Sequence, residues 1–122
     1  MAGTLTTTEE TFGSVKKIKF EWVADGSGDV SGTDTTAVFS GEIMRLVTVP
    51  GTGGTQPDDN YNVVINDADS TDVLMGAGAT RDETNTEQVL ASSLGIVAND
   101  KLSLVIDSAG AANTGTVYVY IR

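Results

Sequence analysis

The chain has 122 residues, no cysteine, no histidine, and a formal net charge of −10 from 17 acidic and 7 basic side chains. The missing cysteines exclude disulfides, thiolate nucleophiles and cysteine-based zinc sites, and the missing histidines remove the commonest general base. The acidic balance disfavours contact with a phosphate backbone or an anionic membrane, so neither nucleic acid nor a membrane is expected as a partner.

The length is that of one domain, which we place at residues 14–122. Residues 1–13 (MAGTLTTTEETFG) are rich in threonine, glycine and glutamate and offer little to bury. We predict a flexible N-terminal arm here, or a segment that orders only against a partner. No basic segment precedes an apolar run, and no stretch has the roughly 20 apolar residues of a membrane-spanning helix, so we expect synthesis in the cytoplasm.

The first predicted strand covers residues 15–22. Ile18, Phe20 and Trp22 alternate with charged residues, a period of two that is typical of a half-buried strand with Trp22 in the core. Lys16, Lys17 and Lys19 form the main basic cluster. We interpret this cluster as a solvated strand face, with a contact to an anion or an acidic partner as the alternative.

The middle of the chain alternates between short apolar segments and polar, glycine-rich connections. Strands are predicted at residues 37–49 (as two strands, or one bent at Gly41), 61–65, 73–75 and 102–106, and loops at 25–36, 50–60 and 76–85. Residues 84–94 (TNTEQVLASSL) have capping-box spacing between Thr84 and Glu87, which favours a short helix; an irregular edge strand is the alternative.

The last segment, residues 116–121 (TVYVYI), is apolar on both sides of a predicted strand. Such a strand lies centrally in a sheet or is covered by another subunit. Seven to eight short strands with at most one short helix, joined by glycine-rich turns, predict an all-β fold. We expect an antiparallel β-sandwich of the jelly-roll type.

Three aspartates in the segment NDADSTDVLMG, residues 66–76, are a candidate calcium site. Clustered carboxylates on a loop are one way to supply the six to eight oxygens that Ca²⁺ prefers. The spacing of Asp67, Asp69 and Asp72 does not match an EF-hand loop, because Asp72 and Gly78 stand where glycine and glutamate belong. The alternative is a tight turn, in which Asn and Asp bond to their own backbone.

Tyr118 and Tyr120 share one side of the last predicted strand, opposite Val117 and Val119. Paired tyrosines suit a subunit interface, where the rings bury area and the hydroxyls keep a partner; contact with a ligand is the alternative. Tyr61 is a further candidate for stacking on a sugar ring.

No catalytic motif is present, and we expect no enzymatic activity and no cofactor beyond the possible calcium. The glycine-rich segments at residues 51–55 and 76–80 lack the lysine and Ser/Thr of a phosphate-binding loop, so they are interpreted as turns. The sequence alone does not place two carboxylates across a cleft as a glycosidase requires.

The order KIKFEWVAD, GEIMRLVTVPG, DDNYNVVINDADSTDVLMGAGATRDETNTEQV and LSLVIDSAGAANTGTVYVYIR, from Lys17 to Arg122, resembles that of small structural proteins of tailed bacteriophages. The resemblance implies a non-enzymatic β-sandwich subunit of the virion and, within that class, a capsid decoration (cement) protein. It further implies a homo-oligomer, with a trimer favoured, that contacts the major capsid protein on the capsid surface. The alternative is a tail- or fibre-associated module that binds carbohydrate or calcium.

Overall fold

The computed structural model describes residues 3–122, apart from the side chain of Thr33. The fold is all-β, with strands β1 (Thr4–Phe12), β2 (Val15–Val23), β3 (Val30–Asp34), β4 (Phe39–Pro50), β5 (Asn62–Asn66), β6 (Glu87–Leu90), β7 (Ile96–Asp100), β8 (Ser103–Asp107) and β9 (Thr114–Ile121). Two short 3₁₀ turns, η1 (Gly53–Thr55) and η2 (Ala91–Ser93), are the helical segments among these residues. None of the described helices is long and apolar enough to span a bilayer.

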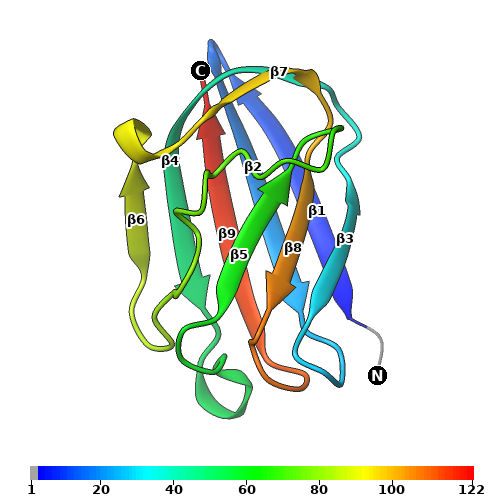
Figure 1. Cartoon of the computed structure of the whole chain (residues 1–122), viewed down its shortest axis with the longest axis vertical. Helices are drawn as coiled ribbons and strands as arrows, with labels where there is room; N and C mark the ends of the chain where they lie inside the picture. The colour runs from blue at the N-terminus through cyan, green and yellow to red at the C-terminus, as the bar shows by residue number, and fades with distance from the viewer. Residues whose placement is uncertain (1–2) are drawn as a thin grey trace.

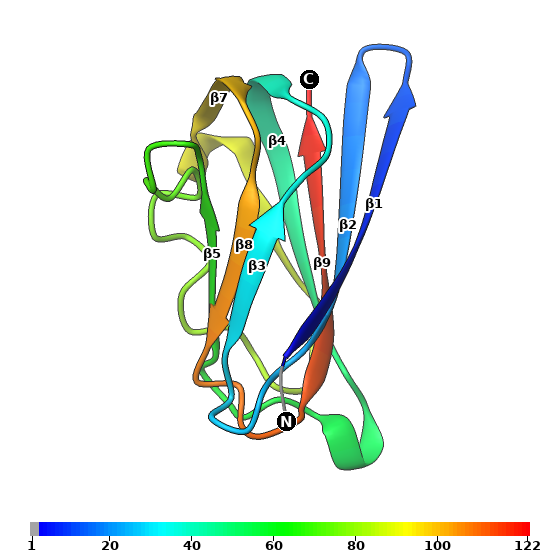
Figure 2. The ribbon, with the colours of Figure 1, turned by 90° about the vertical axis from the view of Figure 1, so that its right-hand side faces the viewer.

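The strands form two antiparallel sheets that face each other (Figures 1 and 2). The larger sheet has the order β1-β2-β9-β4-β6, with β7 also paired to β4, and the smaller has the order β3-β8-β5. Strands β2 to β5 alternate between the sheets, and β8 and β9 fill the centres of the smaller and the larger sheet. The predicted all-β antiparallel class is confirmed, whereas the jelly-roll topology stays a prediction.

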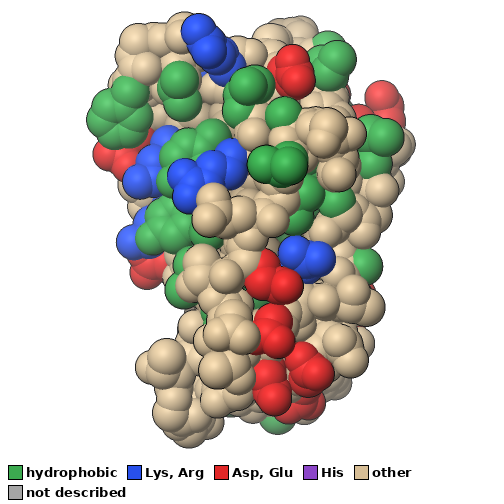
Figure 3. Space-filling view, turned by 90° about the vertical axis from the view of Figure 1, so that its left-hand side faces the viewer, with side chains coloured by type: hydrophobic (Ala, Val, Ile, Leu, Met, Phe, Trp, Pro, Cys, Tyr) green, Lys and Arg blue, Asp and Glu red, His purple; other side chains and the backbone are tan. Residues whose placement is uncertain are grey.

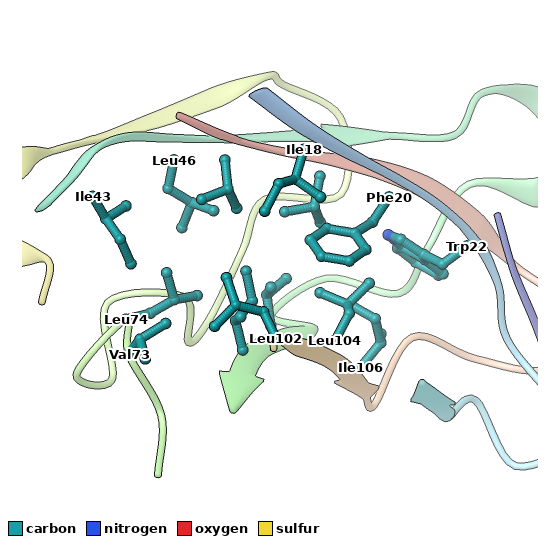
Figure 4. Close-up of a cluster of buried hydrophobic side chains, with 14 of the residues drawn as sticks. Ile18, Phe20, Trp22, Ile43, Leu46, Val73, Leu74, Leu102, Leu104 and Ile106 are labelled. Atoms are coloured by element: carbon teal, nitrogen blue, oxygen red, sulfur yellow. The ribbon is translucent and has the colours of Figure 1, made fainter. Parts of the chain in front are cut away.

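The core lies between the sheets and is built from hydrophobic side chains where β2 faces β8 (Figure 4). Ile18, Phe20 and Trp22 of β2 point toward Leu104 and Ile106 of β8, and all five side chains are at most 1% exposed. Burying each such side chain contributes about 1.5–3 kcal/mol, so the predicted alternation of β2 is what holds the two layers together. The expectation that Trp22 is a core residue is confirmed.

Residues 4–12 form strand β1 rather than the flexible arm predicted for residues 1–13. This strand pairs with β2 along its whole length, from Thr4 opposite Val23 to Phe12 opposite Val15. Its side chains bury little, so backbone pairing and not core packing holds it, which is why composition missed it. The first two residues of the predicted arm lie outside the described residues.

Residues 84–94 contain an edge strand and not the favoured helix. Strand β6 pairs with β4 from Arg45 opposite Leu90 to Thr48 opposite Glu87, and η2 follows it directly. The capping-box spacing fails because the Glu87 carboxylate accepts a hydrogen bond from the backbone of Asp82, outside the expected helix, at 2.8 Å. The alternative of an irregular edge strand is the one that the structure shows.

Other boundaries also differ from the sequence expectation. Strand β3 lies within the loop expected at residues 25–36, and β7 lies in a segment for which no element was predicted. The predicted strand at residues 73–75 is a turn. Residues 39–50 form one continuous strand, as in the alternative of a single strand bent at Gly41. Its register shifts between Phe39 and Gly41 against β7, and a second shift lies between Ile43 and Arg45 against β9. Strands β3 and β7 each pair on one side only. Strand β3 has a single large apolar residue, and the apolar residues of β7 are consecutive (Ile96, Val97 and Ala98), so a period of two had little signal in either.

Candidate interaction face

The outer side of the larger sheet, turned away from the smaller sheet, carries the most distinctive set of side chains. The strand register places Lys17 of β2, Tyr120 of β9 and Arg45 of β4 in one row across the sheet. The adjacent row holds Lys19, Tyr118 and Val47. We call Lys17, Lys19, Arg45, Tyr118 and Tyr120 the cation–tyrosine face.

The cations of this face lie over the tyrosine rings. The Lys17 Nζ is 5.2 Å from the ring centroid of Tyr118 and 6.0 Å from that of Tyr120. The Arg45 guanidinium is 5.2 Å from the Tyr120 centroid, and its Nε donates a hydrogen bond to Gln88 Oε1 at 2.9 Å. Cation–π contacts of this length orient the side chains, so the face presents a pre-arranged pattern of positive charge and aromatic surface.

The face concentrates positive charge although the chain is strongly acidic, and Glu10 of β1, opposite Lys17, is an acidic residue at its margin. Three of the seven basic residues lie in this face. In Figure 3 basic and hydrophobic side chains gather on the upper left with a few acidic ones beside them, and the largest group of acidic side chains lies in the lower half. Lys19 forms a 2.7 Å ion pair with Glu21, and the hydrogen bond to that carboxylate raises the pKa of Lys19. Lys17 and Arg45 have no carboxylate within salt-bridge distance among the described residues.

Apolar side chains extend the face at both margins. Leu90, opposite Arg45 on β6, is 75% exposed, and Phe12, near the end of β1, is 58% exposed. Large exposed apolar residues beside tyrosine and arginine are the composition of an interface core. No further layer of the described chain covers this side of the sheet (Figure 2).

The predicted interface residues Tyr118 and Tyr120 therefore lie side by side on an uncovered surface, each half-buried. Of the lysine cluster, Lys17 and Lys19 join them, whereas Lys16 donates its Nζ hydrogen bond to the Ser40 carbonyl at 3.0 Å. Sequence reasoning did not single out Arg45, because its place beside Tyr120 depends on the pairing of β4 with β9, which is not a local property.

A hollow of about 310 Å³ adjoins the face on the same side of the sheet. The side chains that line the hollow include the Glu21 carboxylate and four threonines from the surrounding strands, namely Thr4, Thr6, Thr114 and Thr116. The turn η1 is tied to one end of it, because the hydroxyls of Thr55 and Thr114 are 3.0 Å apart. The hollow thus offers hydrogen-bond donors and acceptors with little net charge.

The aspartate segment is a corner between β5 and the turn that follows it. The Asp67 carboxylate accepts hydrogen bonds from the backbone N–H groups of Asp69 and Thr71, at 2.9 and 3.1 Å. The Asp72 carboxylate accepts from Leu74 at 3.0 Å and from Gly76 at 2.9 Å. Both side chains bond their own backbone, as the turn interpretation requires.

Neither candidate ligand site beyond the face is assembled in the structure. Within residues 3–122 no group of three or more acidic side chains is placed to hold a metal ion, Asp67, Asp69 and Asp72 included. Tyr61 is 0% exposed and packs against Trp22, with ring centroids 5.6 Å apart, so it is a core residue and not a stacking platform. Its hydroxyl finds no hydrogen-bond partner in the described part of the chain, and burial raises the pKa of Tyr61 to about 12.

Comparisons with known proteins add no assignment: no family model, curated protein or solved structure matches the chain.

Proposed function

We propose that this chain is a non-enzymatic structural protein of a tailed-bacteriophage particle, a capsid decoration protein that assembles as a homo-oligomer on the shell. The observation that supports assembly is the cation–tyrosine face, which combines uncovered Tyr118, Tyr120 and Arg45 on a rigid sheet. Tyrosine and arginine are enriched among residues that dominate binding energy, and strands hold them in fixed positions. The capsid location rests on the resemblance to phage structural proteins.

The charge of the face favours one kind of contact. Two copies that met face to face about a two-fold axis would bring Lys17, Lys19 and Arg45 of one copy against the same cations of the other, which is repulsive. A contact with a different, acidic surface avoids this repulsion. If the face of each copy binds a different patch on the next copy, the copies can close into a ring, which is compatible with the favoured trimer. The major capsid protein is the other proposed partner.

The test measures association and shell binding together. Light scattering at two concentrations is expected to show three-fold association for the wild-type chain, and Arg45→Glu and Tyr118→Ser are each expected to lose that three-fold association. Val64→Ser, on the outer side of the smaller sheet, is the matched control and should leave the mass unchanged. Expanded, undecorated phage shells should co-sediment with the wild-type chain. A wild-type chain that stays monomeric and does not bind shells would refute the proposal.

A second candidate, a carbohydrate-binding module of a tail or fibre, is favoured by the hollow beside the face. Four threonine hydroxyls and the Glu21 carboxylate match the hydrogen-bonding needs of a neutral sugar. A glycan array is the discriminating experiment, with Thr116→Val as the variant that removes one hydroxyl from the hollow. Binding that the variant loses would favour this candidate, and an array without hits would dismiss it.

A further inference from the structure

Strand β1 is a long, regular and unpaired sheet edge. It is the terminal strand of the larger sheet and pairs with β2 over nine residues without any shift in register. Its sequence, TLTTTEETF, has no proline, lysine or glycine. Proline, bulges and charged side chains, lysine above all, are the features by which proteins usually keep edge strands from pairing. Of these β1 has the two glutamates Glu9 and Glu10, and the Glu9 carboxylate is bound to the loop between β3 and β4. Threonine strongly favours strand structure.

The other edges of the two sheets are each short, irregular or covered. Strand β3 has five residues and a shift in register, and β6 has four residues and runs directly into η2. The outer side of β5 is covered by the following segment, since the Val63 N–H donates to the Gly78 carbonyl and the Val73 N–H to the Ile65 carbonyl, both at 2.8 Å. Among the described strands, β1 alone offers a long template for another strand (Figure 2).

The backbone groups available on β1 follow from its hairpin. Residues Phe12 and Val15 flank a two-residue turn in which Gly13 has a φ of +61°, so this pair is hydrogen-bonded. Bonded and non-bonded pairs alternate in an antiparallel ladder. The N–H and C=O groups directed away from β2 are therefore those of alternate residues, namely Leu5, Thr7, Glu9 and Thr11.

The edge is held in place in the single molecule. The Glu9 carboxylate accepts hydrogen bonds from the backbone N–H groups of Thr36 and Ala37, each at 2.8 Å, which ties the middle of β1 to the loop between β3 and β4. A pre-organised edge loses little conformational freedom when a second strand adds to it.

The sequence of β1 is compatible with pairing to itself in one register. With the two-fold axis at Thr8, Leu5 of one copy faces Thr11 of the other and Thr7 faces Glu9, so all the outward N–H and C=O groups pair. Glu10 then faces Thr6, and no two glutamates are opposite. A two-fold axis at Glu9 or Glu10 would set like charges directly against each other, which is destabilising, and an axis at Thr7 shortens the overlap.

From this geometry we infer that a second copy of the chain adds to β1 in antiparallel fashion and joins the two larger sheets into one continuous sheet across a two-fold axis at Thr8. This contact goes beyond the proposed function, because it uses the edge of the sheet and not the cation–tyrosine face. It predicts a specific pair of close residues: Thr8 and its copy form a non-hydrogen-bonded pair with Cα atoms about 4.5 Å apart.

A single cysteine tests this register directly, since the chain has none of its own. Disulfides form when Cα atoms are roughly 4.4–6.8 Å apart, so Thr8→Cys is expected to give a covalent dimer on a denaturing gel after mild oxidation. Thr4→Cys is the matched control: it is on the same side of β1, but in this register the two copies of residue 4 are about 27 Å apart. It should cross-link only at the rate of random collisions.

A second variant separates the edge from other contacts. Thr7→Pro removes an outward N–H that the single molecule does not use, so Thr7→Pro in the Thr8→Cys background should fold and lose the cross-link. Thr8→Cys cross-linking no faster than Thr4→Cys would overturn the inference, whatever the mass of the wild-type chain. The double variant Arg45→Glu, Thr8→Cys should still cross-link, because Arg45 is not part of the edge contact. The cross-link therefore tests the edge contact independently of the proposed cation–tyrosine face.

Discussion

Substituting Gly115 by alanine is expected to destabilise the fold through one contact in the core. Gly115 of β9 is directly opposite Trp22 of β2, and a Cβ atom at Gly115 would lie 2.7 Å from Cε2 and 3.0 Å from Nε1 of the indole. Carbon atoms in contact are about 3.5–4.0 Å apart, so the ring must move by close to 1 Å. It has little room, because it is 1% exposed and packs against Tyr61.

The magnitude follows from two opposing effects. Overpacking a core costs about 1–3 kcal/mol, and alanine in place of glycine restricts the unfolded chain, which offsets roughly 0.4–1 kcal/mol. We expect a net loss of about 1–2 kcal/mol in the free energy of unfolding, or a fall in Tm of roughly 4–12 °C. Urea denaturation followed by the fluorescence of Trp22, the single tryptophan, measures it.

Two further variants make the result specific to this contact. Gly54→Ala is the control, because no atom lies within 4 Å of a Cβ there, and it should change stability by less than about 0.5 kcal/mol. In a Trp22→Phe background, followed by circular dichroism, the smaller ring leaves space, and Gly115→Ala should cost clearly less. An unchanged cost in that background would refute the packing of Trp22 on Gly115.

Three other predictions concern buried and turn-forming groups. Because burial raises the pKa of Tyr61 to about 12 while an unfolded phenol titrates near 10, stability is complete below pH 10 and falls by up to about 3 kcal/mol as the pH rises toward 12; urea curves of Tyr61→Phe should lack this loss. Asp72→Ala should cost about 1–3 kcal/mol in thermal unfolding and Asp69→Ala little, since the Asp72 carboxylate satisfies turn N–H groups; a calcium-dependent rise in Tm would contradict this. Hydrogen bonds from Asp29 and Ser27 lower the pKa of Asp25, so its contribution is present above about pH 4 and lost in acid; the stability difference between wild type and Asp25→Asn should vanish as the pH falls, and a constant difference would argue against it.

The central strands were predictable from the sequence because their side chains carry the signal. In β2 and β9 every second residue enters the core, so Ile18, Phe20 and Val119 mark the strands unambiguously. Strands β1 and β3 have few buried side chains, and what holds them is the backbone of a neighbour distant in sequence. Composition cannot report that neighbour, and the same polar residues therefore predicted an arm and a loop.

The candidate site divides in the same way. That Tyr118 and Tyr120 share one side of a strand follows from its period of two and needs no structure. The cations beside them come from β2 and β4, which flank β9 in the sheet although both are far from β9 in the sequence. The irregularity between Ile43 and Arg45 shifts the register so that Arg45, and not Met44, is opposite Tyr120. The aspartate corner, in contrast, was interpretable from local rules, because four of the hydrogen bonds to Asp67 and Asp72 join residues only two to four positions apart. A fifth, from the Ile65 N–H to the Asp72 carboxylate at 3.2 Å, spans seven positions.

The proposed edge contact and the proposed face contact would reinforce each other. Side chains directly opposite in an antiparallel pair point to the same side of the sheet, so pairing through β1 would leave both cation–tyrosine faces on one side of the joined sheet. Such a dimer presents two copies of Lys17, Tyr120 and Arg45 to the same surface. Once one face of the dimer is bound, binding of its second face is intramolecular, which raises avidity without any new contact. A variant that keeps the face and loses the edge, such as Thr7→Pro, should therefore bind an extended acidic surface more weakly than the wild-type chain, while retaining the affinity of a single face.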